Sequence, residues 1–209
     1  MSRIIYLHGF ASSPASKKAR FFKDRFAELG IGLEIPDLAE GNFERLTITG
    51  QLQVIERTAR GEPVHLMGSS MGGYLAALYA ARHPEVEKLM LMAPAFSFPS
   101  RWPETLGEQV MEHWRATNQM TVFHYAEGRE MALGYQLMED AKQYESYPKF
   151  TQPVLIFHGC SDTVVPLEYS VRFAERQAKA ILHMVNSDHE LIDVLDLMWR
   201  ETEEFFFGA

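Results

Sequence analysis

The sequence has almost no cysteine, no long hydrophobic run and no long basic run, and each shortage excludes a class of protein. A single cysteine, Cys160, in 209 residues rules out an intramolecular disulfide and fits a reducing compartment. No apolar stretch approaches the roughly 20 residues of a membrane-spanning helix, so no membrane partner is expected. The 20 basic and 28 acidic residues give a formal charge of −8, which argues against nucleic acid as a partner.

The beginning of the chain also lacks the features of a secretion signal. The apolar segment Arg3–Leu7 follows Met1 almost at once, without a long hydrophobic region or a small-residue cleavage site. We therefore expect a cytoplasmic protein. The length and the apolar content of 46% are sufficient for one α/β domain with a substantial core.

Short apolar runs alternate along the chain with segments of helical periodicity. The runs lack polar alternation, which is typical of strands buried on both faces of a parallel sheet. Strand–helix alternation predicts an α/β fold with right-handed crossovers and a doubly wound sheet. The expected strands are Arg3–Leu7, Leu33–Ile35, Val64–Met67, Lys88–Met92, Pro153–Phe157 and Ile181–Val185. The expected helices are Ser16–Leu29, Phe43–Ala59, Gly73–Arg82, Leu167–Ala178 and His189–Phe206.

The long stretch between Pro94 and Pro153 breaks this alternation, because it holds no clear core strand. A structureless loop of that length is uncommon in a compact domain. We expect a cap insertion at about 97–150, over one edge of the sheet. Its expected elements are a helix from a capping box at Thr105-Leu106-Gly107-Glu108 to about Arg115, a hairpin of Thr121–Tyr125 and Met131–Tyr135, and a helix at Leu137–Tyr144.

The segment Gly68-Ser69-Ser70-Met71-Gly72 has the form G-x-S-x-G and lies between an expected strand and an expected helix. This is the context of a nucleophile elbow, where small residues two positions before and after the serine let the strand and helix pass closely. The amides that follow the serine lie at a helix N-terminus, where negative charge is stabilised. Ser70 is therefore the candidate nucleophile, and the alternative is a tight turn without a chemical role.

Two later residues can complete a site around this serine. A serine hydroxyl needs a base within hydrogen-bond reach, and the base needs a third group that fixes its tautomer. Asp162 follows the fifth expected strand and His189 follows the sixth, in the order serine, acid, histidine. Asp188 is the neighbour of His189 and is better placed to cap the following helix, while Asp37 comes too early in the chain.

Four motifs in this order make the chain resemble compact members of the α/β-hydrolase superfamily. It is most similar to small bacterial serine esterases and acyl thioesterases whose first strand ends in H-G-F-x-S-S-P. The motifs are His8-Gly9-Phe10-Ala11-Ser12-Ser13-Pro14, Gly68-Ser69-Ser70-Met71-Gly72-Gly73, the G-x-x-D-x-x-V-P segment from Gly159 to Pro166, and Asp188-His189. The resemblance implies a minimal six-stranded, mostly parallel sheet with helices on both faces. It also implies an oxyanion hole formed by the backbone N–H groups of Phe10 and Met71.

A metal-dependent hydrolase is the competing interpretation of the same histidines. His8, His158, Asp162 and His189 could all end near one edge of the sheet, but the chain has no H-E-x-x-H motif and no clustered ligand spacing. We therefore expect neither a metal site nor a cofactor, and we expect His8 to brace the loop after the first strand.

The expected substrate is a small-molecule ester or thioester, hydrolysed through an acyl-enzyme. The aromatic and methionine side chains of the cap could line an acyl pocket or could simply pack the cap on the core. Other reactions of the same three residues stay open, namely those of an amidase, a lactonase, a perhydrolase or a C–C bond hydrolase. A non-catalytic ligand-binding protein with this fold is a further alternative, and the sequence does not define the oligomeric state. The candidate pocket residues are Ser12, Trp102, Trp114 and Val164. Arg101, Arg115 and Arg129 could meet an anionic group, such as that of a coenzyme A thioester, or could be solvated.

Overall fold

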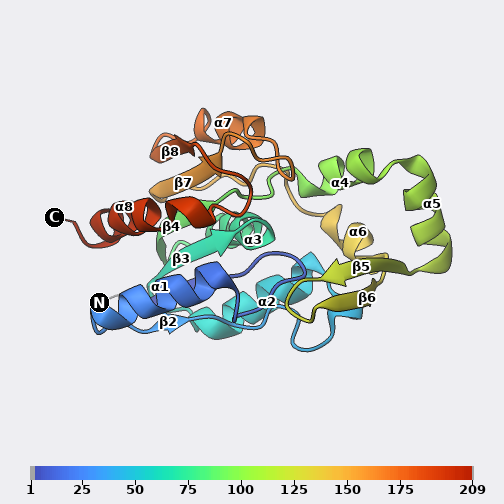
Figure 1. Ribbon diagram of the computed structural model, residues 1–209, viewed down its shortest axis with the longest axis horizontal. Helices are drawn as coiled ribbons and strands as arrows, with labels where there is room; N and C mark the ends of the chain where they lie inside the picture. The colour runs from blue at the N-terminus through green and yellow to red at the C-terminus, as the bar shows by residue number, and fades with distance from the viewer. Residues whose placement is uncertain (1–2, 209) are drawn as a thin grey trace.

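The computed structural model describes residues 3–208, and its main feature is one sheet of six strands (Figure 1). The strands lie in the order β2-β1-β3-β4-β7-β8, and every neighbouring pair is parallel. The chain starts inside the sheet and extends it in both directions, as in a doubly wound fold. The expected α/β class and six-stranded sheet are confirmed. The strands are β1 Arg3–Leu7, β2 Leu33–Glu34, β3 Val64–Ser69, β4 Val86–Met92, β7 Val154–Gly159 and β8 Ala180–Val185.

Helices cover both faces of this sheet and divide the core in two. Helices α1 and α8 lie side by side on one face (Figure 1), while α2 and α3 contact each other on the other face. Because successive side chains of a strand point to opposite faces, Ile4 of β1 packs with α1 and α8, and Ile5 packs with α2 and α3. These helices are α1 Lys17–Glu28, α2 Ile48–Ala59, α3 Met71–Ala80, α7 Glu168–Ala174 and α8 Leu195–Phe207.

Two expected helices begin later than the periodicity suggested. The segment expected to be one helix from Phe43 divides into a 3₁₀ turn, Phe43–Arg45, and α2, because the Thr47 hydroxyl accepts a hydrogen bond from the Gly50 amide at 2.9 Å and caps α2. The last helix does not begin at His189. Leu191 has a left-handed backbone with φ of 57°, and a second 3₁₀ turn precedes α8. His189 therefore lies in a loop.

The segment between β4 and β7 forms two helices, a hairpin and a third helix, which Figure 1 shows beyond the carboxyl ends of the sheet strands. The expected antiparallel hairpin is present. The expected capping box is wrong, because Thr105 lies inside α4 and its hydroxyl donates to the carbonyl of Arg101 at 3.0 Å. Gly107, with φ of 82°, separates α4 from α5 without a side-chain cap. These elements are α4 Phe98–Leu106, α5 Glu108–Thr117, β5 Met120–His124, β6 Arg129–Leu133 and α6 Gln136–Ala141.

Candidate active site

Ser70 occupies a strained turn between β3 and α3. Its backbone has φ of 53° and ψ of −113°, a conformation that costs about 1–3 kcal/mol for a residue with a side chain. A methyl group on Gly72 would overlap the carbonyl oxygen of Leu7 and lie 2.6 Å from that of His8. A methyl group on Gly68 would lie 2.6 Å from the carbonyl carbon of Gly72. The two glycines of the motif are therefore required by the close passage of strand and helix.

Backbone hydrogen bonds hold this serine in place. The Ser70 amide donates to the carbonyl of Met92 at 2.8 Å, and the Ser70 carbonyl accepts from the amides of Tyr74 at 3.1 Å and Ala95 at 2.9 Å. The turn is thus anchored to β4, to α3 and to the loop that follows β4. Strain of this kind persists only where the surrounding structure fixes the conformation, as it does here.

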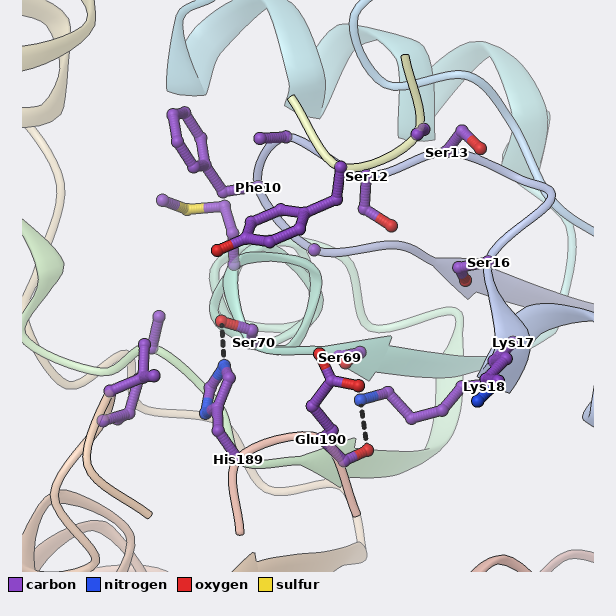
Figure 2. Close-up of a pocket in the computed structure, with 18 of the residues that line it drawn as sticks. Phe10, Ser12, Ser13, Ser16, Lys17, Lys18, Ser69, Ser70, His189 and Glu190 are labelled. Carbon is purple, nitrogen blue, oxygen red and sulfur yellow. Dashed lines mark hydrogen bonds between the residues drawn. The ribbon is translucent and has the colours of Figure 1, made fainter. Parts of the chain in front are cut away.

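The structure brings Ser70, His189 and Asp162 together from the loops after β3, β8 and β7. His189 Nε2 lies 3.1 Å from Ser70 Oγ, and His189 Nδ1 lies 2.7 Å from Asp162 Oδ2. Figure 2 shows the imidazole ring pointing at the serine hydroxyl. With the ring proton on Nδ1, where it can donate to the carboxylate, Nε2 is left to accept the proton of the serine hydroxyl.

Asp162 is buried, and its environment keeps it ionised. Its side chain is 0% exposed, and Oδ1 accepts hydrogen bonds from the amides of Val164 and Val165, each at 2.8 Å. Burial pushes the pKa of this carboxyl upward, but hydrogen bonds from His158, His189 and the Val165 amide outweigh burial and lower the pKa far below its usual value. The carboxylate is therefore charged at neutral pH and can orient His189.

His158 is a further part of this arrangement, although its sequence context indicated only a possible metal ligand. It is fully buried at the end of β7, with Nε2 lying 2.8 Å from the carbonyl oxygen of Val165 and 3.2 Å from Asp162 Oδ2. Nε2 faces two acceptors and therefore carries the proton, so Nδ1 accepts from the Ser170 hydroxyl at 2.7 Å. His158 and His189 thus both donate to Oδ2 of the Asp162 carboxylate. The only sequence signal for this contact is that His158 precedes Asp162 by four residues.

The two residues expected to supply the oxyanion hole, Met71 and Phe10, both border the cavity that holds Ser70. Met71 is the first residue of α3, and Phe10 lies in the turn after β1. Within residues 3–208, neither amide donates a hydrogen bond to a protein acceptor. His8 braces the turn, since its Nε2 accepts from the Leu38 amide at 3.2 Å while Nδ1 donates to the Gly9 carbonyl at 2.9 Å. Burial lowers the pKa of His8, which favours this neutral form.

A cavity of about 920 Å³ opens at Ser70 and His189, between the sheet edge and the cap. Three of the four candidate pocket residues, Ser12, Trp102 and Val164, line it. The fourth, Trp114, does not. Its ring is buried inside the cap against Trp102 and Tyr135, and its Nε1 donates to the Leu133 carbonyl at 2.8 Å. The expectation for Trp114 is therefore corrected, because the ring packs the cap itself.

The histidines and acidic residues considered as possible metal ligands do not form a metal site. In the part of the chain that the structure describes, no group of three or more His, Cys, Asp or Glu side chains has the arrangement of a metal site. His8 accepts a hydrogen bond from the Leu38 amide, whereas His158 and His189 both contact Oδ2 of Asp162. None of the helices within residues 3–208 has the length and apolar character needed to cross a bilayer.

The doubly wound sheet and the strained serine between β3 and α3 define the chain as an α/β hydrolase. Within that superfamily, residues 3–206 match the model of the Uncharacterised protein family UPF0227, and the chain belongs to this family.

Curated relatives and solved structures agree with the α/β-hydrolase fold. The chain is 28% identical to monoacylglycerol lipase ABHD6 of Rattus norvegicus, over 96% of this chain and 61% of the relative. It is 27% identical to the mitochondrial palmitoyl-protein thioesterase ABHD10 of Bos taurus, over 93% of this chain and 69% of the relative. The structure of mouse alpha/beta hydrolase domain-containing protein 10 superimposes with a TM-score of 0.82 at 22% identity, covering 97% of this chain and 88% of that one. The chain thus spans about three fifths of the ABHD6 length.

Proposed function

We propose that the protein is a serine hydrolase that cleaves carboxylic ester or thioester bonds of small to medium acyl substrates. The observation that supports this best is the hydrogen-bond chain from Ser70 Oγ through His189 to Asp162, with distances of 3.1 Å and 2.7 Å. A serine is a weak nucleophile at neutral pH, and it is activated by an imidazole base whose other ring nitrogen is held by a carboxylate.

The reaction follows from the positions of these groups. Ser70 Oγ attacks the substrate carbonyl while His189 Nε2 takes the hydroxyl proton, and the Asp162 carboxylate stabilises the imidazolium. The amides of Met71 and Phe10 donate to the oxyanion. His189 then gives its proton to the departing alcohol or thiol, which leaves an acyl group on Ser70. Water, deprotonated by His189, attacks the acyl carbonyl; the bond to Ser70 Oγ then breaks, His189 returns the proton to Oγ, and the acid is released.

The cavity and the relatives support an acyl substrate. The volume of about 920 Å³ lies within the range of small-molecule sites. Its walls include the apolar side chains of Phe98, Trp102 and Val122. One relative is named a lipase and another a thioesterase. An ester and a thioester present the same carbonyl to a serine, so both substrate types belong to the proposal.

A panel of p-nitrophenyl esters with acyl chains of increasing length, together with acyl thioesters and amides, tests this proposal. We expect Ser70→Ala to abolish turnover of the esters and thioesters. Ser100→Ala removes an exposed hydroxyl on α4 and serves as the matched control, for which we expect wild-type rates. Ester turnover that survives Ser70→Ala would overturn the proposal, and turnover of amides alone would shift it to an amidase.

A further inference from the structure

Arg101 is a buried cation without an acidic partner at the edge of the proposed active site. It lies on α4, is 7% exposed and lines the cavity that holds Ser70. Its Nη1 donates to the carbonyl oxygen of Val164 at 2.8 Å, while Nε is buried and has no partner. Among residues 3–208, no carboxylate lies within 4.0 Å of this guanidinium. Buried arginines are normally paired, because an isolated charge is costly away from water.

The other two arginines singled out in the cap have ordinary surroundings. Arg115 Nε donates to the hydroxyl of Tyr135 at 3.1 Å. Arg129 has a side chain that is 65% exposed, and it lies 3.9 Å from the Glu127 carboxylate. Neither residue lines the cavity. The burial and the missing partner therefore distinguish Arg101 from arginines that are simply solvated.

The charges around the cavity are also unlike those of the chain as a whole. The chain has a formal charge of −8. The cavity, in contrast, is lined by Lys17, Lys18 and Arg101 and, among the acidic residues that the structure describes, by Glu190 alone. Figure 2 shows Lys18 on the Glu190 side of Ser70, and its Nζ donates to the Glu190 backbone carbonyl at 2.6 Å, which leaves the lysine charge without a carboxylate bond. The cavity thus favours a negatively charged ligand.

The Asp162 charge favours the protonated form of Arg101, but the carboxylate forms no ion pair or hydrogen bond with the guanidinium. Its Oδ1 accepts from the Val164 and Val165 amides, and its Oδ2 faces His158 and His189. Burial lowers the pKa of Arg101, but a guanidinium stays protonated in proteins because its ordinary pKa is so high. A permanent positive charge therefore lines the cavity that holds Ser70, and its Nε–H has no partner within residues 3–208.

We propose that Arg101 binds a carboxylate carried by the substrate while the ester or thioester carbonyl lies at Ser70. The planar N–H groups of a guanidinium match the oxygens of a carboxylate, and the unpartnered Nε–H of Arg101 is such a donor. The substrate class would then be esters or thioesters with a second, anionic group in the acyl half or in the leaving half. This inference rests on the proposed function and specifies its substrate. Arg101 is a specificity residue, since it acts on binding and not on the bond that breaks.

Three chromogenic esters test the inference: neutral p-nitrophenyl butyrate, mono-p-nitrophenyl glutarate with a carboxylate in the acyl half, and 3-carboxy-4-nitrophenyl butyrate with a carboxylate in the leaving half. We expect the wild-type protein to show a higher kcat/KM for one of the two anionic esters than for the neutral ester. In Arg101→Gln the ratio of anionic to neutral kcat/KM should fall about 10- to 100-fold, mainly through KM, because a charge-assisted hydrogen bond is lost. Arg101→Lys should give an intermediate ratio.

Arg129→Gln is the matched control, since it removes an exposed cap arginine outside the cavity, and both kcat/KM values should stay at wild-type level. Two failures can be distinguished. Absence of Ser70-dependent turnover of any of the three esters would contradict the proposed function itself. Ser70-dependent turnover with a wild-type preference for the neutral ester, or with a ratio unchanged in Arg101→Gln, would overturn the Arg101 inference alone. If Arg101→Gln does not fold in thermal melts, the wild-type ratio and the Arg101→Lys ratio decide the question.

Discussion

The backbone of Ser70 gives a prediction about stability that is independent of substrate. Its φ of 53° and ψ of −113° cost about 1–3 kcal/mol for any residue with a Cβ. Ser70→Ala keeps the Cβ and therefore keeps this strain, whereas Ser70→Gly removes it. Glycine loses about 0.5–1 kcal/mol through its greater backbone entropy in the unfolded chain. Subtracting this entropic loss from the relieved strain leaves the glycine variant more stable than the alanine variant by about 1 kcal/mol.

Both variants lose the hydrogen bond between Ser70 Oγ and His189, so their comparison isolates the backbone. For a chain of this size, about 1 kcal/mol corresponds to a difference in Tm of about 2–4 °C. Thermal unfolding followed by circular dichroism, with urea titrations at the same pH, measures it. We expect Ser70→Gly to melt above Ser70→Ala with an unchanged m-value. A glycine variant that melts at or below the alanine variant would refute the claim that the elbow stores strain.

Three further predictions concern the surroundings of the elbow. Gly72→Ala should destabilise the protein by about 3 kcal/mol or more, because the added methyl group meets backbone atoms. Gly32→Ala, which has open space around it, should change stability by less than about 0.5 kcal/mol, and urea titrations compare the two variants. His158→Phe should lower kcat on the order of 10- to 100-fold with little change in KM, and His158→Gln, which keeps an N–H donor, should recover part of the loss in steady-state assays. Because the pKa of Asp162 is depressed in the folded protein, its contribution to stability is present above the unfolded value of about 3.9 and is lost as pH falls below it. The Tm gap between wild type and Asp162→Asn should therefore be wide at pH 7 and shrink in melts below about pH 4, and a constant gap would contradict this linkage.

Local signals in the sequence were sufficient for the sheet and for the elbow. Apolar runs predicted all six sheet strands, and β1 occupies Arg3–Leu7 as expected. The small residues on both sides of Ser70 indicated the strand–turn–helix that the structure contains. The order of Ser70, Asp162 and His189 along the chain also predicted correctly that the three would meet, because parallel strands end at one edge of a sheet. Their catalytic roles stay a prediction.

Features that depend on tertiary packing were beyond the sequence. The Thr105 motif looked like a capping box, yet that threonine lies inside α4 and bonds to its own helix. Trp114 looked like a pocket residue, but the cap encloses it. Arg101 could not be separated from Arg115 and Arg129, because burial and the absence of a partner are properties of the folded chain and leave no pattern in the residues themselves.

The central claim is that Ser70 is a nucleophile activated by His189 and held by Asp162. Treatment with a fluorophosphonate probe, followed by intact-mass measurement and peptide mapping, tests this claim most directly. We predict one label per chain, on Ser70, in the wild-type protein, and no label in Ser70→Ala. We also expect strongly slowed labelling in His189→Ala, because the base that takes the serine proton is absent. An unlabelled wild-type protein, or a label on another serine with equal rate in both variants, would contradict the account.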